Sequence, residues 1–329
     1  MTTYAPPWWC PPVDGDALVA VVDGLRAGGI DIVAEQPLGP WTTLGVGGSA
    51  EVFAEIGDDG QLMTLMRSLA EVDESMVPLL VIGRGSNLLI ADSGWPGLAI
   101  RLGAAFKTFT RTGLRVSARA AASMPALAAW AATQGLSGLE FAAGIPATVG
   151  GSVRMNAGAH GGEVAQRLVA AQIAVPGRAE ISMVSAAELQ FSYRRSVLPP
   201  RAVIAGAQWE LFADDAEAIR ARLDDLRAWR RSTQPLRQRN CGSVFTNPDG
   251  DSAGRLVDAA GLKGRRRGGA QVSERHANFI VVDPPCAAAD VYGLITELRR
   301  VVHLTGGPLL QPEVRIIGDF GKAAADAGE

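Results

Sequence analysis

The sequence predicts an α+β fold, on three observations. Strand patterns follow one another through the first two-thirds of the chain, which argues against a regular doubly wound sheet. From residue 214 the pattern becomes helix-first, which indicates that a new unit begins there. The length of 329 residues suggests two or three domains at about 150 residues each.

The first two-thirds contain three helices with apolar residues at helical spacing. Residues 14–28 begin near Asp14 or Asp16 and end at glycine, a second helix starts at residue 58, and Ser123 caps a third over 123–134. A short helix is expected at 185–190. Short apolar or alternating runs predict strands at 51–56, 78–82, 88–90, 98–102, 114–118, 167–175, 180–184 and 202–211.

The last third opens with a long charged amphipathic helix, Asp214–Arg231. The remaining elements are helices at 254–260 and 287–304 and strands at 279–282 and 314–317. The end of the chain, from residue 318, is small and polar and is expected to be frayed.

Composition excludes several classes of protein. The formal net charge is −3, with a sequence pI of 5.8, so nothing draws the chain to nucleic acid at long range. The one dense basic run, 265–267, could contact nucleic acid, but it fits a local anion site or a solvated loop better. No signal peptide and no membrane-spanning apolar run is recognisable.

Cysteine and histidine spacing predicts no metal site. Cys10, Cys241 and Cys286 are odd in number and form no CxxC pair, so neither a disulfide framework nor a zinc site is indicated. The three histidines, at 160, 276 and 303, also lack metal-ligand spacing. We therefore expect a reduced, cytoplasmic setting.

The stretch Gly138–Gly162 is the most informative in the chain. It contains too many glycines for ordinary core and too few charges for a solvated linker. Glycine allows backbone to approach a ligand closely, so this stretch suggests amides around a large phosphate-bearing molecule. The alternative is a tightly packed turn–helix–turn.

A second glycine-rich segment, Gly83–Leu88, invites a dinucleotide interpretation. Leu88 stands where a third glycine belongs, and an apolar strand follows instead of a helix, so the nicotinamide fingerprint fails. A strand–loop–strand with two glycines and a Ser-Asn pair can still bind a diphosphate. The alternative is a plain hairpin. Thr42–Ala50 is a third segment of small residues. Three such segments in one chain fit one extended cofactor better than three unrelated turns.

These segments together resemble the UDP-N-acetylenolpyruvoylglucosamine reductase (MurB) family of FAD enzymes in bacterial peptidoglycan precursor synthesis. The resemblance continues through Phe191–Ser196, Cys241–Pro248, Ala253–Leu256 and Gly268–Ser273 and ends at Gln311–Arg315. It covers nearly the whole chain, in family order.

The resemblance implies an FAD-binding fold of the vanillyl-alcohol-oxidase (PCMH) type in two subdomains, plus a C-terminal α/β substrate-binding domain. We expect the first subdomain over 1–76 with a returning strand at 310–320, the second over 77–212, the substrate domain over 213–309 and a flexible tail over 321–329. It also implies non-covalent FAD, NADPH as co-substrate and a UDP-sugar substrate, and we expect a monomer.

The resemblance assigns roles to residues at matching positions. Ser243 is the proton donor and Arg194 contacts the enolpyruvyl carboxylate. Glu313 assists protonation or polarises the carboxylate together with the arginine. Tyr193, Lys263, Gln271, Ser273 and Arg237 are expected to bind substrate. The residues expected to bind the cofactor lie in the two glycine-rich segments: Gly83, Arg84, Gly85, Ser86, Asn87, Leu88, Gly144, Ile145, Gly150, Gly151, Ser152, Asn156, Ala157 and Gly158.

The chain departs from the family pattern in three places. Thr233 stands where many members carry lysine, so Arg231 or Arg237 would have to bind the diphosphate instead. Trp41 replaces the usual asparagine before Thr42-Thr43. The short span between Tyr193 and Ser243 resembles the subgroup without an extra lid loop. Two rival functions are an FAD oxidase of a hydroxy acid and a flavin-binding module without catalysis.

Overall fold

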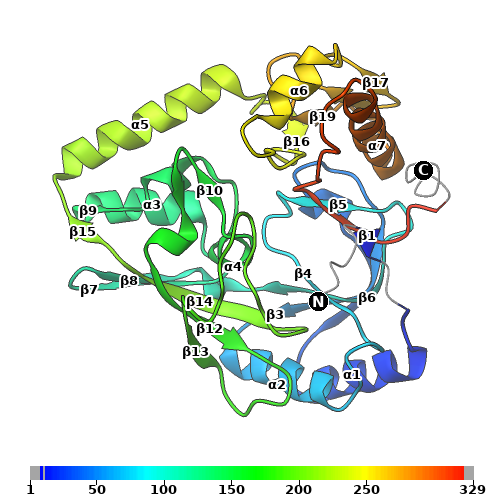
Figure 1. Ribbon diagram of the computed structural model, residues 1–329. Coiled ribbons are helices and arrows are strands. Elements are labelled where there is room, and N and C mark those ends of the chain that lie inside the picture. The colour runs from blue at the N-terminus through cyan, green and yellow to red at the C-terminus, as the bar shows by residue number, and fades with distance from the viewer. Residues whose placement is uncertain (1–7, 10–11, 322–329) are drawn as a thin grey trace.

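The computed structural model describes residues 8–9 and 12–321. The predicted tail therefore lies almost wholly outside the described residues. Figure 1 shows two sheet-containing lobes with a smaller helical and stranded unit above them, reached along one long helix. Among the described residues, no helix is long and apolar enough to cross a membrane.

The first lobe is a four-stranded sheet with two helices packed beneath it (Figure 1). The helices bury apolar stripes against the sheet, and Asp14 and Asp58 cap their first turns. In sheet order the strands are β2 (Ile32–Pro37), β3 (Ser49–Ile56), β6 (Trp95–Leu102) and β4 (Leu79–Val81), and the helices are α1 (Gly15–Ala27) and α2 (Asp59–Ala70).

The second lobe is a five-stranded antiparallel sheet that packs on helices α3 (Met124–Thr133) and α4 (Val149–Arg154). Its strands, in sheet order, are β13 (Ser182–Ser185), β12 (Leu168–Ala174), β14 (Val203–Glu210), β8 (Arg115–Arg119) and β7 (Phe109–Thr112). Two small ribbons complete it: β9 (Leu136–Ser137) with β15 (Phe212–Ala213), and β10 (Gly158–Ala159) with β11 (Gly162–Glu163).

The third unit follows the long helix α5 (Ala216–Thr233). Its four-stranded antiparallel sheet runs β16 (Arg239–Asn240), β19 (Ile280–Val282), β18 (Ala270–Val272), β17 (Arg266–Arg267), with helices α6 (Ala253–Ala259) and α7 (Ala288–Leu304). The chain then returns as β20 (Arg315–Ile317), which pairs in parallel with β5 (Leu88–Ile90) and β1 (Trp8–Trp9).

Two contacts tie the third unit to the first lobe. Asp92, just after β5, accepts hydrogen bonds from Ala288 N and Ala289 N at the start of α7, at 2.8 and 2.9 Å. Leu44 and Leu89 of the first lobe belong to the same buried apolar cluster as the α7 side chains. The β5–β20 pairing thus brings the Gly83–Leu88 loop next to the C-terminal strand.

Most expected elements are confirmed, and the predicted helix at 185–190 is wrong. Residues 186–190 form turns, and the Glu188 carboxylate accepts hydrogen bonds from both Ser185 N and its hydroxyl. A side chain that bonds its own turn competes with helix formation. Strands β4 and β6, which the expected division put in the second subdomain, pair within the first sheet, so that sheet extends to Leu102.

Candidate active site

The predicted strand–loop–strand at Gly83–Leu88 is confirmed, because β4 and β5 flank it and no helix follows. Gly85 has φ +60, and a Cβ there would lie 2.3 Å from the Trp41 carbonyl oxygen. At Gly83 a Cβ would lie 2.5 Å from Thr148 Oγ1. Only glycine fits at these two positions, so the loop can lie against both neighbouring segments.

A cavity of about 300 Å³ opens beside this loop. Its walls include the Trp41 indole, with the Arg101 guanidinium 4.7 Å from the ring centroid, and Arg84. Neither arginine has an ion pair within the described part of the chain. An aromatic ring with unpaired guanidinium groups suits a base and phosphates.

The second glycine-rich stretch does contain a helix, the six-residue α4, capped by Thr148 Oγ1, which accepts from Gly151 N. Gly144 lies against Arg230 of α5, where a Cβ would come within 2.2 Å of the arginine side chain. Ile145 and Gly150 are half-buried, and Gly150 packs on Ala120. The small residues here let α5 and α4 close on the second lobe.

Two buried hydroxyls beside these segments have no hydrogen-bond partner. Ser152 in α4 is fully buried with its Oγ unpaired, and Thr43 Oγ1 next to the Gly85 loop is also unpaired. Unpaired buried polar groups are rare unless a ligand completes them. Together with the glycines and the unpaired arginines, they fit a large phosphate-bearing cofactor such as FAD.

Asn156 is fully buried but its side chain is already used by the protein. Its Nδ2 donates to Ser192 O and its Oδ1 accepts from Ala165 N, both at 3.0 Å. The amide thus braces the turn that carries Tyr193 and Arg194. Ala157 and Gly158 follow it, half-buried, at the start of the β10–β11 ribbon.

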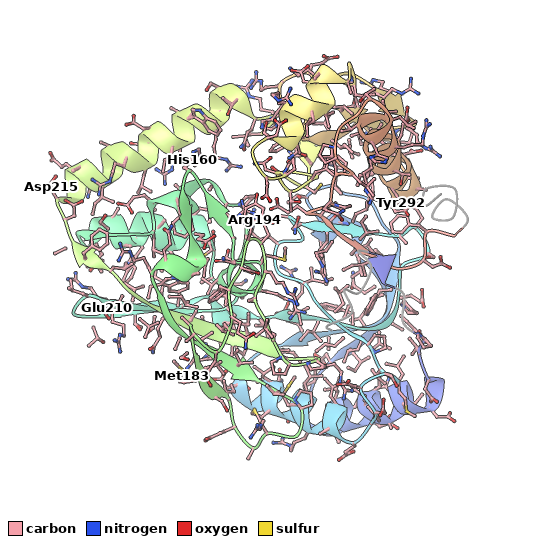
Figure 2. All side chains as sticks on the ribbon, in the orientation of Figure 1. His160, Met183, Arg194, Glu210, Asp215 and Tyr292 are labelled. Atoms are coloured by element: carbon pink, nitrogen blue, oxygen red, sulfur yellow. The ribbon has the colours of Figure 1, made fainter. Side chains whose placement is uncertain are left out.

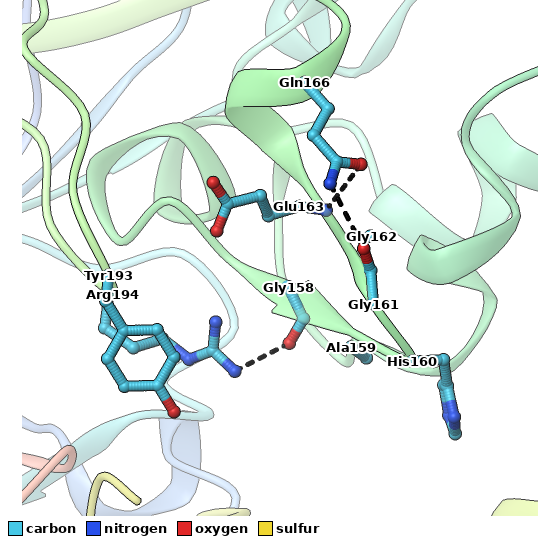
Figure 3. A pocket seen from close by; sticks show the side chains of 9 residues that line it. All are labelled: Gly158, Ala159, His160, Gly161, Gly162, Glu163, Gln166, Tyr193 and Arg194. Atoms are coloured by element: carbon cyan, nitrogen blue, oxygen red, sulfur yellow. Dashed lines mark hydrogen bonds between the residues drawn. The ribbon is translucent and has the colours of Figure 1, made fainter. Parts of the chain in front are cut away.

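The centre of the site is an ion pair between residues 119 positions apart. Arg194 Nε donates to Glu313 Oε1 at 2.8 Å, and both side chains are about four-fifths buried, at 21% and 17% exposure. Arg194 Nη2 also donates to Gly158 O at 2.9 Å (Figure 3). Its backbone has φ +57, and its guanidinium lies 4.7 Å from the Tyr193 ring centroid.

A cavity of about 220 Å³ lies beside Arg194. Figure 3 shows the residues that line it. Arg194, Tyr193 and the β10–β11 ribbon line it, with His160 at the ribbon's turn. His160 contacts Trp229 of α5 edge-to-face, 4.6 Å between ring centroids, and Figure 2 places it beneath α5. Burial, together with Arg230, lowers the pKa of His160, which favours its neutral form.

Burial raises the pKa of Glu313, because removing the carboxylate from water outweighs the opposing effect of Arg194. The raised pKa means that Glu313 holds its proton to a higher pH than an exposed glutamate does. Perturbed carboxyls of this kind are frequent at functional sites.

Ser243 lies in a tight loop directly after β16. Gly242 has φ +76 and donates its N–H to Asn240 Oδ1 at 2.9 Å. Glu313 N donates to Val244 O at 2.8 Å, so the Ser243 loop and the Glu313 segment are joined by backbone. Cys241 is buried, and burial raises the pKa of its thiol to about 12, which fits a packing residue.

Of the residues expected to bind substrate, three have side chains that are hydrogen-bonded within the protein and two have exposed side chains. Lys263 Nζ pairs with Asp258 at 2.7 Å, Gln271 is held by Arg266 and by Gly264 O, and Ser273 is buried with its hydroxyl accepting from two backbone N–H groups. Tyr193 and Arg237 are exposed. The substrate roles of all five residues stay predictions, and of the two exposed ones Tyr193 lines the cavity beside Arg194.

Sequence reasoning missed several residues that shape the site: Thr148, Arg101 and Arg230. Thr148 precedes a helix and so carried a capping signal. The other two are ordinary arginines in a strand and a helix, and nothing in their spacing marks them.

Comparison with known proteins defines first the class and then the family. Residues 56–176 match the model of the FAD binding domain, and residues 234–317 match that of the UDP-N-acetylenolpyruvoylglucosamine reductase C-terminal domain. A flavoprotein domain is thus joined to a reductase-type C-terminal domain.

Relatives that align with most of the chain agree. The chain is 42% identical to UDP-N-acetylenolpyruvoylglucosamine reductase of Granulibacter bethesdensis, covering 86% of this chain and 89% of the relative. It is 44% identical to the Heliobacterium modesticaldum reductase, covering 87% and 91%. The crystal structure of the Thermus caldophilus reductase (MurB) superimposes with a TM-score of 0.75 at 36% identity, covering 88% and 99%. The chain belongs to the UDP-N-acetylenolpyruvoylglucosamine reductase (MurB) family.

Proposed function

We propose that this protein reduces UDP-N-acetylglucosamine enolpyruvate to UDP-N-acetylmuramate with NADPH, through non-covalently bound FAD, for cell-wall peptidoglycan synthesis. The observation that carries the proposal is the buried Arg194–Glu313 pair, which lies between the glycine-rich Gly144–Gly158 stretch and the Ser243 loop. Both relatives named above carry this reductase name.

FAD, when bound, would supply two-electron hydride-transfer chemistry between NADPH and the enolpyruvyl sugar. The protein would hold it by the Gly83–Leu88 loop and the Gly144–Gly158 stretch. The Ser152 and Thr43 hydroxyls are available to it as donors. Trp41, Arg84 and Arg101 line the cavity suited to its nucleotide end.

The substrate steps fall to three residues. Arg194 binds the enolpyruvyl carboxylate and stabilises the charge that accumulates on it after hydride delivery. Ser243 donates a proton to the carbon next to that carboxylate, which completes the lactyl ether. Glu313 accepts a hydrogen bond from Arg194 and so holds the guanidinium in place, and with its raised pKa it assists proton transfer to the substrate.

We also propose the division of the chain and its setting. The first FAD subdomain spans the first sheet to about residue 102 with β20, the second runs to residue 212, and the substrate domain covers 213–309. A cytoplasmic protein without nucleic-acid partners fits the charge and cysteine content, and we propose that it is a monomer. Tyr193 and Arg237, with Arg230 or Arg231 in place of the usual lysine, are proposed to bind the UDP moiety.

Steady-state oxidation of NADPH tests this proposal. We expect NADPH to be oxidised only when the UDP-enolpyruvyl sugar is present. The product should be heavier than that sugar by two hydrogen atoms. Rapid NADPH oxidation that needs only oxygen, with no reduced sugar formed, would contradict the proposal and favour an FAD oxidase.

A further inference from the structure

Asn278 contacts the backbone on the C-terminal side of Ser243 at three points. Its side chain is only 4% exposed, although it carries two polar groups. Its Oδ1 accepts from Phe245 N at 2.9 Å, and its Nδ2 donates to Phe245 O at 2.8 Å. Its own carbonyl accepts from Val244 N at 2.8 Å. One residue therefore satisfies three backbone groups of the two residues that follow Ser243.

The same short segment also bonds to Glu313, the second residue proposed to transfer a proton. Glu313 N donates to Val244 O, and Val244 N donates to the Asn278 carbonyl. The Val244–Phe245 backbone therefore lies between Asn278 and the Glu313 segment. A shift of this backbone would move the Ser243 hydroxyl relative to Glu313 and Arg194.

No other role for the Asn278 side chain is visible in the described residues. Its carboxamide bonds only to Phe245, and burial keeps it from contacting a ligand directly. The Ser243 hydroxyl, in contrast, has no hydrogen bond to the described residues, so its position depends on its backbone.

We propose that Asn278 is a positioning residue for proton donation by Ser243. Its carboxamide fixes the Val244–Phe245 backbone and so places the Ser243 hydroxyl within reach of the enolpyruvyl carbon that it protonates. This inference rests on the proposed function. It assigns Asn278 to the half-reaction with the sugar substrate alone, since nothing links it to the NADPH step.

The test compares the two half-reactions of the FAD-loaded protein under anaerobic conditions. Asn278→Asp keeps the shape and the acceptor but turns the donor toward Phe245 O into a second acceptor. We expect FAD reduction by NADPH within two-fold of wild type. We expect reoxidation by the UDP-enolpyruvyl sugar to slow about 10- to 100-fold at pH 8, because misplacement of a reacting group by about 1 Å costs roughly that much.

The pH profile separates positioning from general loss of structure. Protonation of the new carboxyl restores a donor to Phe245 O, so reoxidation in Asn278→Asp should recover as pH falls. Glu313, His276 and Lys263 also titrate or carry charge near this segment. The matched control is Asn247→Asp, an exposed change in the same domain that leaves those three groups in place.

The outcomes are distinguishable. Equal slowing of both half-reactions, or reoxidation within two-fold of wild type, would overturn the role of Asn278. If Asn278→Asp does not retain FAD, Asn278→Ser is measured, and loss of FAD there as well assigns Asn278 to folding and overturns the inference. Wild-type reduced protein that the sugar fails to reoxidise would instead overturn the proposed function.

Discussion

The Gly83–Leu88 loop and the Ser243 loop both hold backbone at the candidate site, but by opposite means. The first depends on absent side chains: Gly83 and Gly85 lie where any Cβ would collide with Thr148 or Trp41. The second depends on a side chain that is present, the Asn278 carboxamide. The cofactor side should therefore be sensitive to added volume, and the proton-transfer side to lost hydrogen bonds.

The largest effect is expected from Gly85→Ala. The new methyl meets the Trp41 carbonyl and the backbone has φ +60, so we expect a loss of about 3 kcal/mol or more of unfolding free energy, together with loss of FAD. Gly113→Ala, at φ +62 in open space, is the matched control and should cost only about 1 kcal/mol. Urea unfolding and flavin content measure both. Equal costs would show that the close approach is unimportant.

Arg194→Lys tests the proton-transfer side of the site. Lysine keeps the charge but cannot bridge Glu313, Gly158 O and a carboxylate with one planar group, so reoxidation of reduced FAD by the sugar should slow about 100-fold. Stopped-flow absorbance measures it. Arg195→Lys, an exposed neighbouring change, should be silent. A variant as fast as wild type would remove Arg194 from the chemistry.

Ser152→Ala tests whether the buried Ser152 hydroxyl binds FAD. Removing an unpaired buried hydroxyl should leave the flavin-free protein as stable as before or slightly more stable. FAD should bind about 2- to 10-fold more weakly, the value of one neutral hydrogen bond. Ser68→Ala, a buried serine that bonds Thr64 O away from the site, should change stability but not FAD affinity. Unchanged FAD affinity in Ser152→Ala would contradict the cofactor role.

Glu313→Gln should show a small pH-dependent effect on stability. Burial raises the pKa of Glu313 above its ordinary value of 4.5, so the native protein holds that proton where the unfolded chain has released it. Wild type should then lose stability relative to Glu313→Gln as pH rises from about 4.5 through the raised pKa. Urea unfolding over that range measures the difference. If wild type instead loses stability relative to Glu313→Gln as pH falls, the pKa of Glu313 is lowered, which would mean that the effect of Arg194 outweighs that of burial.

Much of the fold was predictable because its elements are long and periodic. Helices α1, α5 and α7 carry regular apolar stripes, and β12 and β14 are buried strands of seven and eight residues. The two- and three-residue strands β16 to β18 are too short to show a period, and α4 is concealed among glycines.

The site was only partly predictable. The glycine segments announce close backbone approach, and the family resemblance marks Arg194, Ser243 and Glu313. The Arg194–Glu313 contact joins residues 119 positions apart, which no local pattern can encode. Asn278 is an ordinary asparagine in the sequence, and only the backbone groups that it satisfies in the fold distinguish it.

The most direct test of the central claim is the visible spectrum of the purified protein, followed anaerobically in wild type and in Ser243→Ala. In wild type, NADPH should bleach the flavin band, and UDP-N-acetylglucosamine enolpyruvate should restore it rapidly. Ser243→Ala should bleach normally and recover about 10²- to 10⁴-fold more slowly, the range for a lost general acid. A protein without flavin, or a bleached wild type that does not respond to the sugar, would contradict the account.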